Sequence, residues 1–71
     1  MSLPRNLYEI EIKYGITSFF KFHEIHASDE VAVAAARAFA KRWRRANPGE
    51  PASLSIYECN PTMRIMAEKV Q

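Results

Sequence analysis

Residues 6–25 read NLYEIEIKYGITSFFKFHEI, and their pattern of apolar and polar side chains decides the fold. In the first half, aromatic and branched apolar residues alternate with mainly charged ones, which is the two-residue period of a half-buried strand. Gly15 ends this alternation and permits the positive φ that a tight turn often needs. The aromatic-rich residues 18–25 follow and are typical of a second strand. The short connection between the two segments predicts a β-hairpin.

After residue 26 the period of the pattern changes to that of a helix. Ser28 is a suitable N-cap, and the two acidic residues after it suit the positive end of the helix dipole. Asn47 can adopt the left-handed conformation that ends helices, and Pro48 prevents continuation. We therefore predict a helix over residues 29–46. At 100° per residue its apolar stripe contains Ala32, Ala35, Ala36, Phe39, Trp43 and Ala46.

The remaining chain contains a third strand, predicted over residues 53–59, and a segment that fits two structures. Residues 63–70 alternate well enough to pair with the third strand, but they also form a helical stripe. We favour the strand, because the connection across Asn60, Pro61 and Thr62 is short and one helix already covers one face of the sheet.

The order β-β-α-β-β restricts the topology of the chain. A right-handed crossover from the second strand through the helix places the first strand between the second and the third. We predict an α+β fold in a single domain over residues 1–71: a four-stranded antiparallel sheet in the order 2-1-3-4 with one helix packed on one face. Residues 1–6 are expected to be a flexible leader. The predicted core contains Tyr8, Ile10, Ile12, Phe20, Phe22, Ala35, Phe39, Trp43, Leu54 and Ile56.

Composition excludes several classes of protein. Apolar residues make up 48% of the 71 residues, which is too many for a disordered chain. The longest apolar run, residues 31–36, is too short to cross a membrane, so we expect no membrane partner. Cys59 is the only cysteine, which excludes a disulfide within the chain and fits a reducing compartment, so we expect a cytoplasmic protein.

The C-terminal part of the predicted helix is rich in basic residues. A row of cations on one helix face could follow a phosphate backbone and bind nucleic acid. Basic residues at a helix C-terminus also offset the helix dipole, and we favour this simpler explanation. The candidate contacts to nucleic acid are Arg37, Lys41, Arg44 and Arg45.

The face of the sheet opposite the helix carries the second candidate site. If the helix covers the side of Ile10 and Phe20, apolar residues of the second strand face solvent among charged ones. Such residues can form a protein interface or a stacking platform for single-stranded bases, and Glu9 and Glu11 on the same face weaken the second alternative. The candidate interface residues are Phe19, Lys21, His23, Ile25 and Tyr57.

No residues in the sequence form a recognisable catalytic or metal-binding motif. His23 lies in a strand, so its neighbour three residues on, His26, cannot chelate a metal with it. Cys59 has no predicted base beside it, and the two glycines cannot form a glycine-rich phosphate loop. We predict no catalytic residue, no metal site and no cofactor.

Together these patterns predict a small non-enzymatic binding module. A domain of this length buries only about 60% of the surface that its unfolded chain exposes, so self-association would add to a small core. We expect a homodimer, or a complex with another protein, through the second strand or the open sheet face. The alternative is a nucleic-acid-binding accessory protein that uses the basic helix face.

Overall fold

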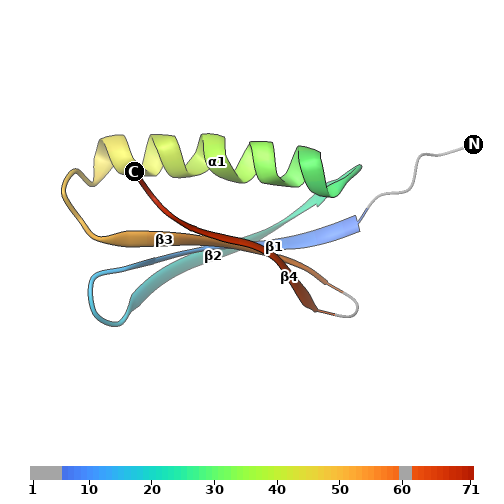
Figure 1. Cartoon of the computed structure of the whole chain (residues 1–71), viewed down its shortest axis with the longest axis horizontal. Helices are drawn as coiled ribbons and strands as arrows, with labels where there is room; N and C mark the ends of the chain where they lie inside the picture. The colour runs from blue at the N-terminus through green and yellow to red at the C-terminus, as the bar shows by residue number, and fades with distance from the viewer. Residues whose placement is uncertain (1–5, 60–61) are drawn as a thin grey trace, which may run out of the picture.

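The computed structural model describes residues 6–59 and 62–71 (Figure 1). The order of elements is the predicted one, and residues 63–69 form a strand rather than a helix. The expected flexible leader lies outside the described residues except for Asn6, which begins the first strand. The predicted turn at residues 60–62 also lies largely outside them. The elements are β1 (Asn6–Tyr14), β2 (Ser18–His26), α1 (Asp29–Ala46), β3 (Ala52–Glu58) and β4 (Met63–Lys69).

The four strands form one sheet in the order β2-β1-β3-β4, and each neighbouring pair is antiparallel. This is the predicted topology. Figure 1 shows α1 running along one face of the sheet, while no described element lies over the other face. The fold therefore has two layers and one open sheet face.

The helix α1 begins and ends at the predicted residues, but the conformation predicted for Asn47 is wrong. The Ser28 hydroxyl accepts a hydrogen bond from the backbone N–H of Val31 at 3.2 Å, as an N-cap should. Asn47 has a φ of −133°, so it is not left-handed. Its side-chain amide instead donates to a carbonyl of the last turn, and the positive φ falls two residues later, at Gly49. The side-chain cap lets the reversal of the chain occur after the proline.

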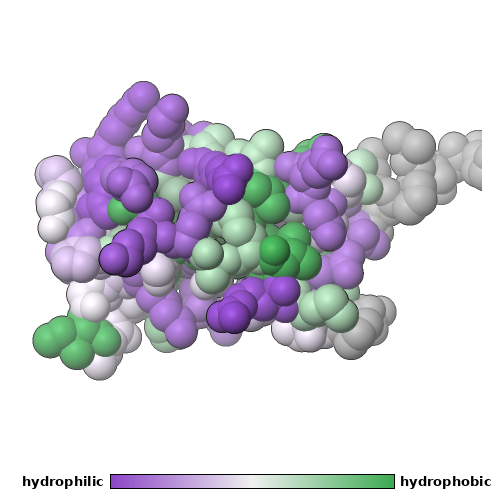
Figure 2. Space-filling view, viewed as in Figure 1, coloured by the Kyte–Doolittle hydropathy of each residue, from purple (hydrophilic) through white to green (hydrophobic). Residues whose placement is uncertain are grey.

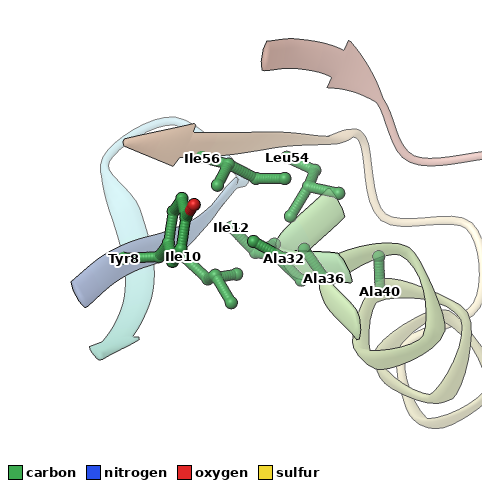
Figure 3. Close-up of a cluster of buried hydrophobic side chains, with 8 residues drawn as sticks. All are labelled: Tyr8, Ile10, Ile12, Ala32, Ala36, Ala40, Leu54 and Ile56. Carbon is green, nitrogen blue, oxygen red and sulfur yellow. The ribbon is translucent and has the colours of Figure 1, made fainter. Parts of the chain in front are cut away.

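The fully buried core lies between α1 and the two central strands (Figure 3). The strands contribute large side chains, and the helix contributes only alanines spaced four residues apart. A row of such small side chains lets the helix backbone approach the sheet closely. The buried residues are Tyr8, Ile10, Ile12, Leu54, Ile56, Ala32, Ala36 and Ala40.

Five residues of the predicted core lie outside the fully buried cluster: Phe20, Phe22, Ala35, Phe39 and Trp43. The helix is turned so that its alanine row, and not its aromatic side chains, faces the central strands. The aromatic rings of the helix therefore pack at its flanks. Phe39 packs towards β2, and the ring of Trp43 lies 5.3 Å from that of Tyr14 at the end of β1.

Candidate protein interface at the β2 edge

Among the described residues, the strand β2 forms one edge of the sheet and pairs only with β1. None of its nine residues is buried, although the strand is rich in aromatic side chains. Its pairing with β1 runs from Ser18 to His26 without a bulge. A regular edge of this kind offers a row of backbone N–H and C=O groups to another strand.

On the open sheet face, the side chains of β2 form an exposed row. Phe19 and Ile25 are 55% and 61% exposed, and they lie towards opposite ends of the strand. Lys21 sits between them with its ammonium 5.7 Å from the centre of the Phe19 ring. The imidazole of His23 lies 3.2 Å from the carboxylate of Glu9. The row therefore combines two apolar side chains with two polar ones, and all four lie where the sequence predicts them.

Tyr57 is separate from this row. It lies in β3, where it faces Glu9 across the β1–β3 pairing, and it is half-buried. The middle of the open face is polar, because Glu11 and Lys13 of β1 lie opposite Ser55 and Ser53 of β3. The exposed apolar side chains of the open face thus lie along β2 and at its β1 neighbour Leu7, and Phe19 and Tyr57 do not form a continuous stacking platform.

On the helix side, β2 contributes to a cluster of three aromatic rings, which we call the phenylalanine cluster: Phe20, Phe22 and Phe39. The ring centres of Phe22 and Phe39 lie 4.8 Å apart, and those of Phe20 and Phe39 lie 5.8 Å apart. Phe20 is 48% exposed. The cluster borders a groove of ≈ 320 Å³ between α1 and β2, with Glu24 and Arg42 among its lining residues.

The sequence-based prediction places the three residues of the phenylalanine cluster in the central core and not at its flank, because the helix phase was set by its large residues. The spacing of Ala32, Ala36 and Ala40 indicates the buried row directly. Continuing that row by four residues reaches Arg44, which explains why Arg44 is half-buried and not on the outer face.

The opposite edge of the sheet is less suited to pairing. The register between β3 and β4 shifts between Ile56 and Tyr57, so β4 is irregular there. Its residues also include the exposed cations Arg64 and Lys69. Bulges and charges of this kind discourage further pairing at an edge. The regular β2 edge is therefore the better acceptor of a strand.

The structure corrects the predicted basic face at Arg44. The Arg44 guanidinium donates to the carbonyls of Asn47, Glu50 and Val70 at 3.0, 2.6 and 2.9 Å. These bonds tie the helix end to the following loop and to the C-terminal residues. Arg44 is a structural residue, because its two terminal nitrogens donate within the fold, while its Nε is buried without a partner among the described residues.

The remaining basic candidates differ in their surroundings. Arg37 donates to the Glu68 carboxylate of β4 at 2.8 and 3.1 Å. Three basic residues near the end of α1 are exposed: Lys41, Arg42 and Arg45. Among the described residues, none of the three makes a side-chain hydrogen bond or an ion pair. The structure thus leaves three cations near the end of α1, in place of the predicted continuous row.

The two histidines lie on opposite faces, as their spacing predicts. His26 is the last residue of β2, and its imidazole lies 3.0 Å from the Glu24 carboxylate. Cys59 follows β3 and is half-buried. Within residues 6–59 and 62–71, no three histidine, cysteine or acidic side chains gather as metal ligands would.

The buried Tyr8 connects β1 to the start of α1. Its hydroxyl donates to the Asp29 carboxylate at 2.6 Å. Burial, and secondly the hydrogen bond to Asp29, raise the pKa of Tyr8, because both disfavour the ionised phenol. This contact fixes the helix start over the central strand.

The fold and this edge define a small two-layer α+β protein with a regular, partly apolar strand at one edge of its sheet. Hydrophilic residues cover most of the side shown in Figure 2, and hydrophobic residues show mainly between helix and sheet and at the β1–β2 turn. For the described part of the chain, no helix combines the length and apolar character needed to cross a membrane. Comparison with protein-family models, curated proteins and solved structures finds no match to this chain.

Proposed function

We propose that this chain is a non-enzymatic protein-interaction module that self-associates through β2 or the adjoining open face. The observation that carries the proposal is the nine-residue outer edge of β2, which is regular, exposed on both of its faces and paired with no other strand in residues 6–59 and 62–71. Apolar side chains flank it on the open face at Phe19 and Ile25 and on the helix side at Phe20. Burying such an edge against another strand would satisfy its backbone groups and remove apolar surface from water.

The composition of the surface supports a protein partner. Three large apolar residues of one strand are each about half exposed or more, and polar side chains lie between them. Apolar and aromatic centres with polar surroundings are typical of protein interfaces. The histidines and glutamates nearby form simple pairs, such as His23 with Glu9 and His26 with Glu24, which a binding surface accommodates without any catalytic role.

Nucleic-acid binding is the second candidate, and one observation favours it. Lys41, Arg42 and Arg45 are exposed near the end of α1. Their number is small, because Arg44 serves the fold and Arg37 pairs with Glu68. A surface with three cations would bind phosphate weakly and lose that binding as salt rises.

Sedimentation velocity across a range of micromolar concentrations tests the proposal. We expect the sedimentation coefficient to rise with concentration as 8.2 kDa chains form dimers. Phe19→Lys should weaken this association, because it places a cation on the exposed row beside Lys21. Lys41→Gln is the matched control, since it changes a charge far from β2. A chain that stays monomeric throughout would contradict the proposal.

A further inference from the structure

The backbone groups that β2 presents to solvent can be identified from the hydrogen bonds of the central strands. The N–H of Cys59 donates to the Leu7 carbonyl at 2.9 Å, and the N–H of Gly15 donates to the Pro51 carbonyl at 3.3 Å. Both bonds join odd-numbered residues, Leu7 in β1 and Gly15 directly after it, to the β3 side. In an antiparallel sheet the N–H and C=O of one residue point to the same neighbour, and successive residues alternate.

It follows that the even-numbered residues of β1 bond to β2. Their partners in β2 are also even-numbered, as in the pair Ile10 and Phe22. The outward backbone groups of β2 therefore belong to its odd-numbered residues: Phe19, Lys21, His23 and Ile25. These are the same residues whose side chains form the exposed row on the open face.

We infer that β2 of a second copy of this chain occupies the edge, antiparallel to the first, with Phe22 on the two-fold axis. This inference rests on the proposed function and specifies the surface and the partner strand. A two-fold axis perpendicular to the sheet joins two identical edges antiparallel and keeps both helices on the same side. The result is a continuous eight-stranded sheet with one open face.

The side chains of β2 select this register over its neighbours. With Phe22 on the axis, all nine residues of β2 pair, Phe19 faces Ile25 of the second copy, and Lys21 faces His23 of the second copy. A shift that centres the pairing on Lys21 would place two lysines opposite each other, which is unfavourable. A shift to His23 would place Lys21 opposite Ile25 and would leave Phe19 outside the strand pairing.

The helix side is consistent with the same register. Phe22 would face its own counterpart across the axis, in a pair that is not hydrogen-bonded and whose side chains lie close. Each Phe22 already contacts Phe39, with ring centres 4.8 Å apart. The two phenylalanine clusters would therefore meet and cover the partly exposed rings. On the open face, Glu11 lies opposite Lys21 within one chain, so the lysine keeps an acidic neighbour when the edge is paired.

Disulfide crosslinking between chains tests the register. In a Cys59→Ser background, chains with Ser18→Cys are mixed with chains that carry His26→Cys and are then oxidised. In the inferred register these two positions face each other in a pair without hydrogen bonds, with Cα atoms about 4.5 Å apart, which a disulfide can span. We expect a covalent dimer of the two variants in about half of the dimers, as random mixing of two chains allows.

Three mixtures serve as controls. Each single variant alone should give no covalent dimer, because the two copies of residue 18 would lie about 27 Å apart along the strands. Mixing Ser18→Cys with Glu24→Cys reports the register centred on Lys21, and mixing Phe20→Cys with His26→Cys reports the one centred on His23. We expect both mixtures to lack the crosslink.

The outcomes separate this inference from the proposed function. The inferred register is overturned if either mixture that reports a shifted register gives more covalent dimer than the mixture of Ser18→Cys with His26→Cys. Dimers in sedimentation velocity without a crosslink in any mixture overturn pairing through β2 and leave self-association through the open face. Chains that are monomeric in the same experiment overturn both.

Discussion

Replacing His23 with proline removes a backbone N–H that points away from β1, and it leaves the N–H groups of the β1–β2 ladder in place. Proline is tolerated at such positions of edge strands, and the residue before it stays in the extended conformation that β2 already has. The monomer of the His23→Pro variant should therefore remain folded. The β2 strand of a second copy should, however, pair with the edge of this variant more weakly.

The expected loss follows from the symmetry of the pairing. In the inferred register the N–H of His23 donates to the carbonyl of Lys21 in the second copy, so each dimer loses two hydrogen bonds. At roughly 1 kcal/mol for each bond, with a further contribution from the two carbonyls left without donors, the total is about 2 to 3 kcal/mol. This corresponds to a dissociation constant raised roughly 30- to 150-fold.

Sedimentation equilibrium measures this change, with far-UV circular dichroism to verify the fold. His23→Thr is the matched control, because it removes the same imidazole and its contact with Glu9 but keeps the backbone N–H. The threonine variant should dimerise nearly as the parent does. If the proline and threonine variants dimerise equally well, the outward groups of β2 are not used and the reasoning is refuted.

Three further predictions concern the fold and the basic residues. Trp43→Ala should lower the free energy of unfolding by about 2 to 3 kcal/mol, which is less than the loss for a fully buried tryptophan. Lys41→Ala, the control, should change it little. Urea denaturation compares the two variants, and equal effects would contradict the packing of Trp43 on Tyr14. Because the pKa of Tyr8 is raised in the folded state, the unfolded chain loses this proton first, so stability should fall as pH rises above about 10. Tyr8→Phe should make this alkaline loss of stability shallower and should lower the free energy of unfolding by about 1.5 to 3 kcal/mol at neutral pH. An unchanged alkaline profile in thermal melts would be inconsistent with the Tyr8–Asp29 contact. Replacing Lys41, Arg42 and Arg45 together with glutamine should abolish any nucleic-acid binding seen at low salt and leave dimerisation unchanged. If a fluorescence titration shows that the parent protein still binds nucleic acid at moderate salt, the nucleic-acid alternative is favoured.

The strand order was predictable because it depends on local patterns. The alternation in residues 6–25 identifies two strands and their buried faces, and the handedness of the crossover then fixes the sheet order. The open-face positions of Phe19, Lys21, His23 and Ile25 follow from the same two-residue period.

The rotation of the helix about its own axis was not predictable from such local patterns. Phe39 lies roughly 60° from Ala36 around the helix axis, so both fall within one broad apolar stripe. Which of them faces the central strands depends on how closely the helix approaches the sheet. The large side chains of Ile10 and Ile56 fill that space, so alanines fit there and the aromatic rings move to the flanks.

The role of Arg44 and the shift in β4 depend on contacts that no local pattern contains. The donors of Arg44 reach Val70, which is 26 residues away in the sequence. The register shift between β3 and β4 arises at one position, between Ile56 and Tyr57, within an otherwise regular strand pairing. Both features result from the path of the chain after the helix, which spacing within the helix or within β4 does not indicate.

Amide hydrogen exchange of β2, followed by NMR at low and high protein concentration, tests the central claim most directly. At low concentration the N–H groups of Phe20, Phe22 and Glu24 should exchange slowly, because they bond to β1, while those of Lys21 and His23 exchange quickly. At a concentration where dimers form, the N–H groups of Lys21 and His23 should become protected as well. Dimers in which these two amides still exchange as fast as in the monomer would contradict pairing through the β2 edge.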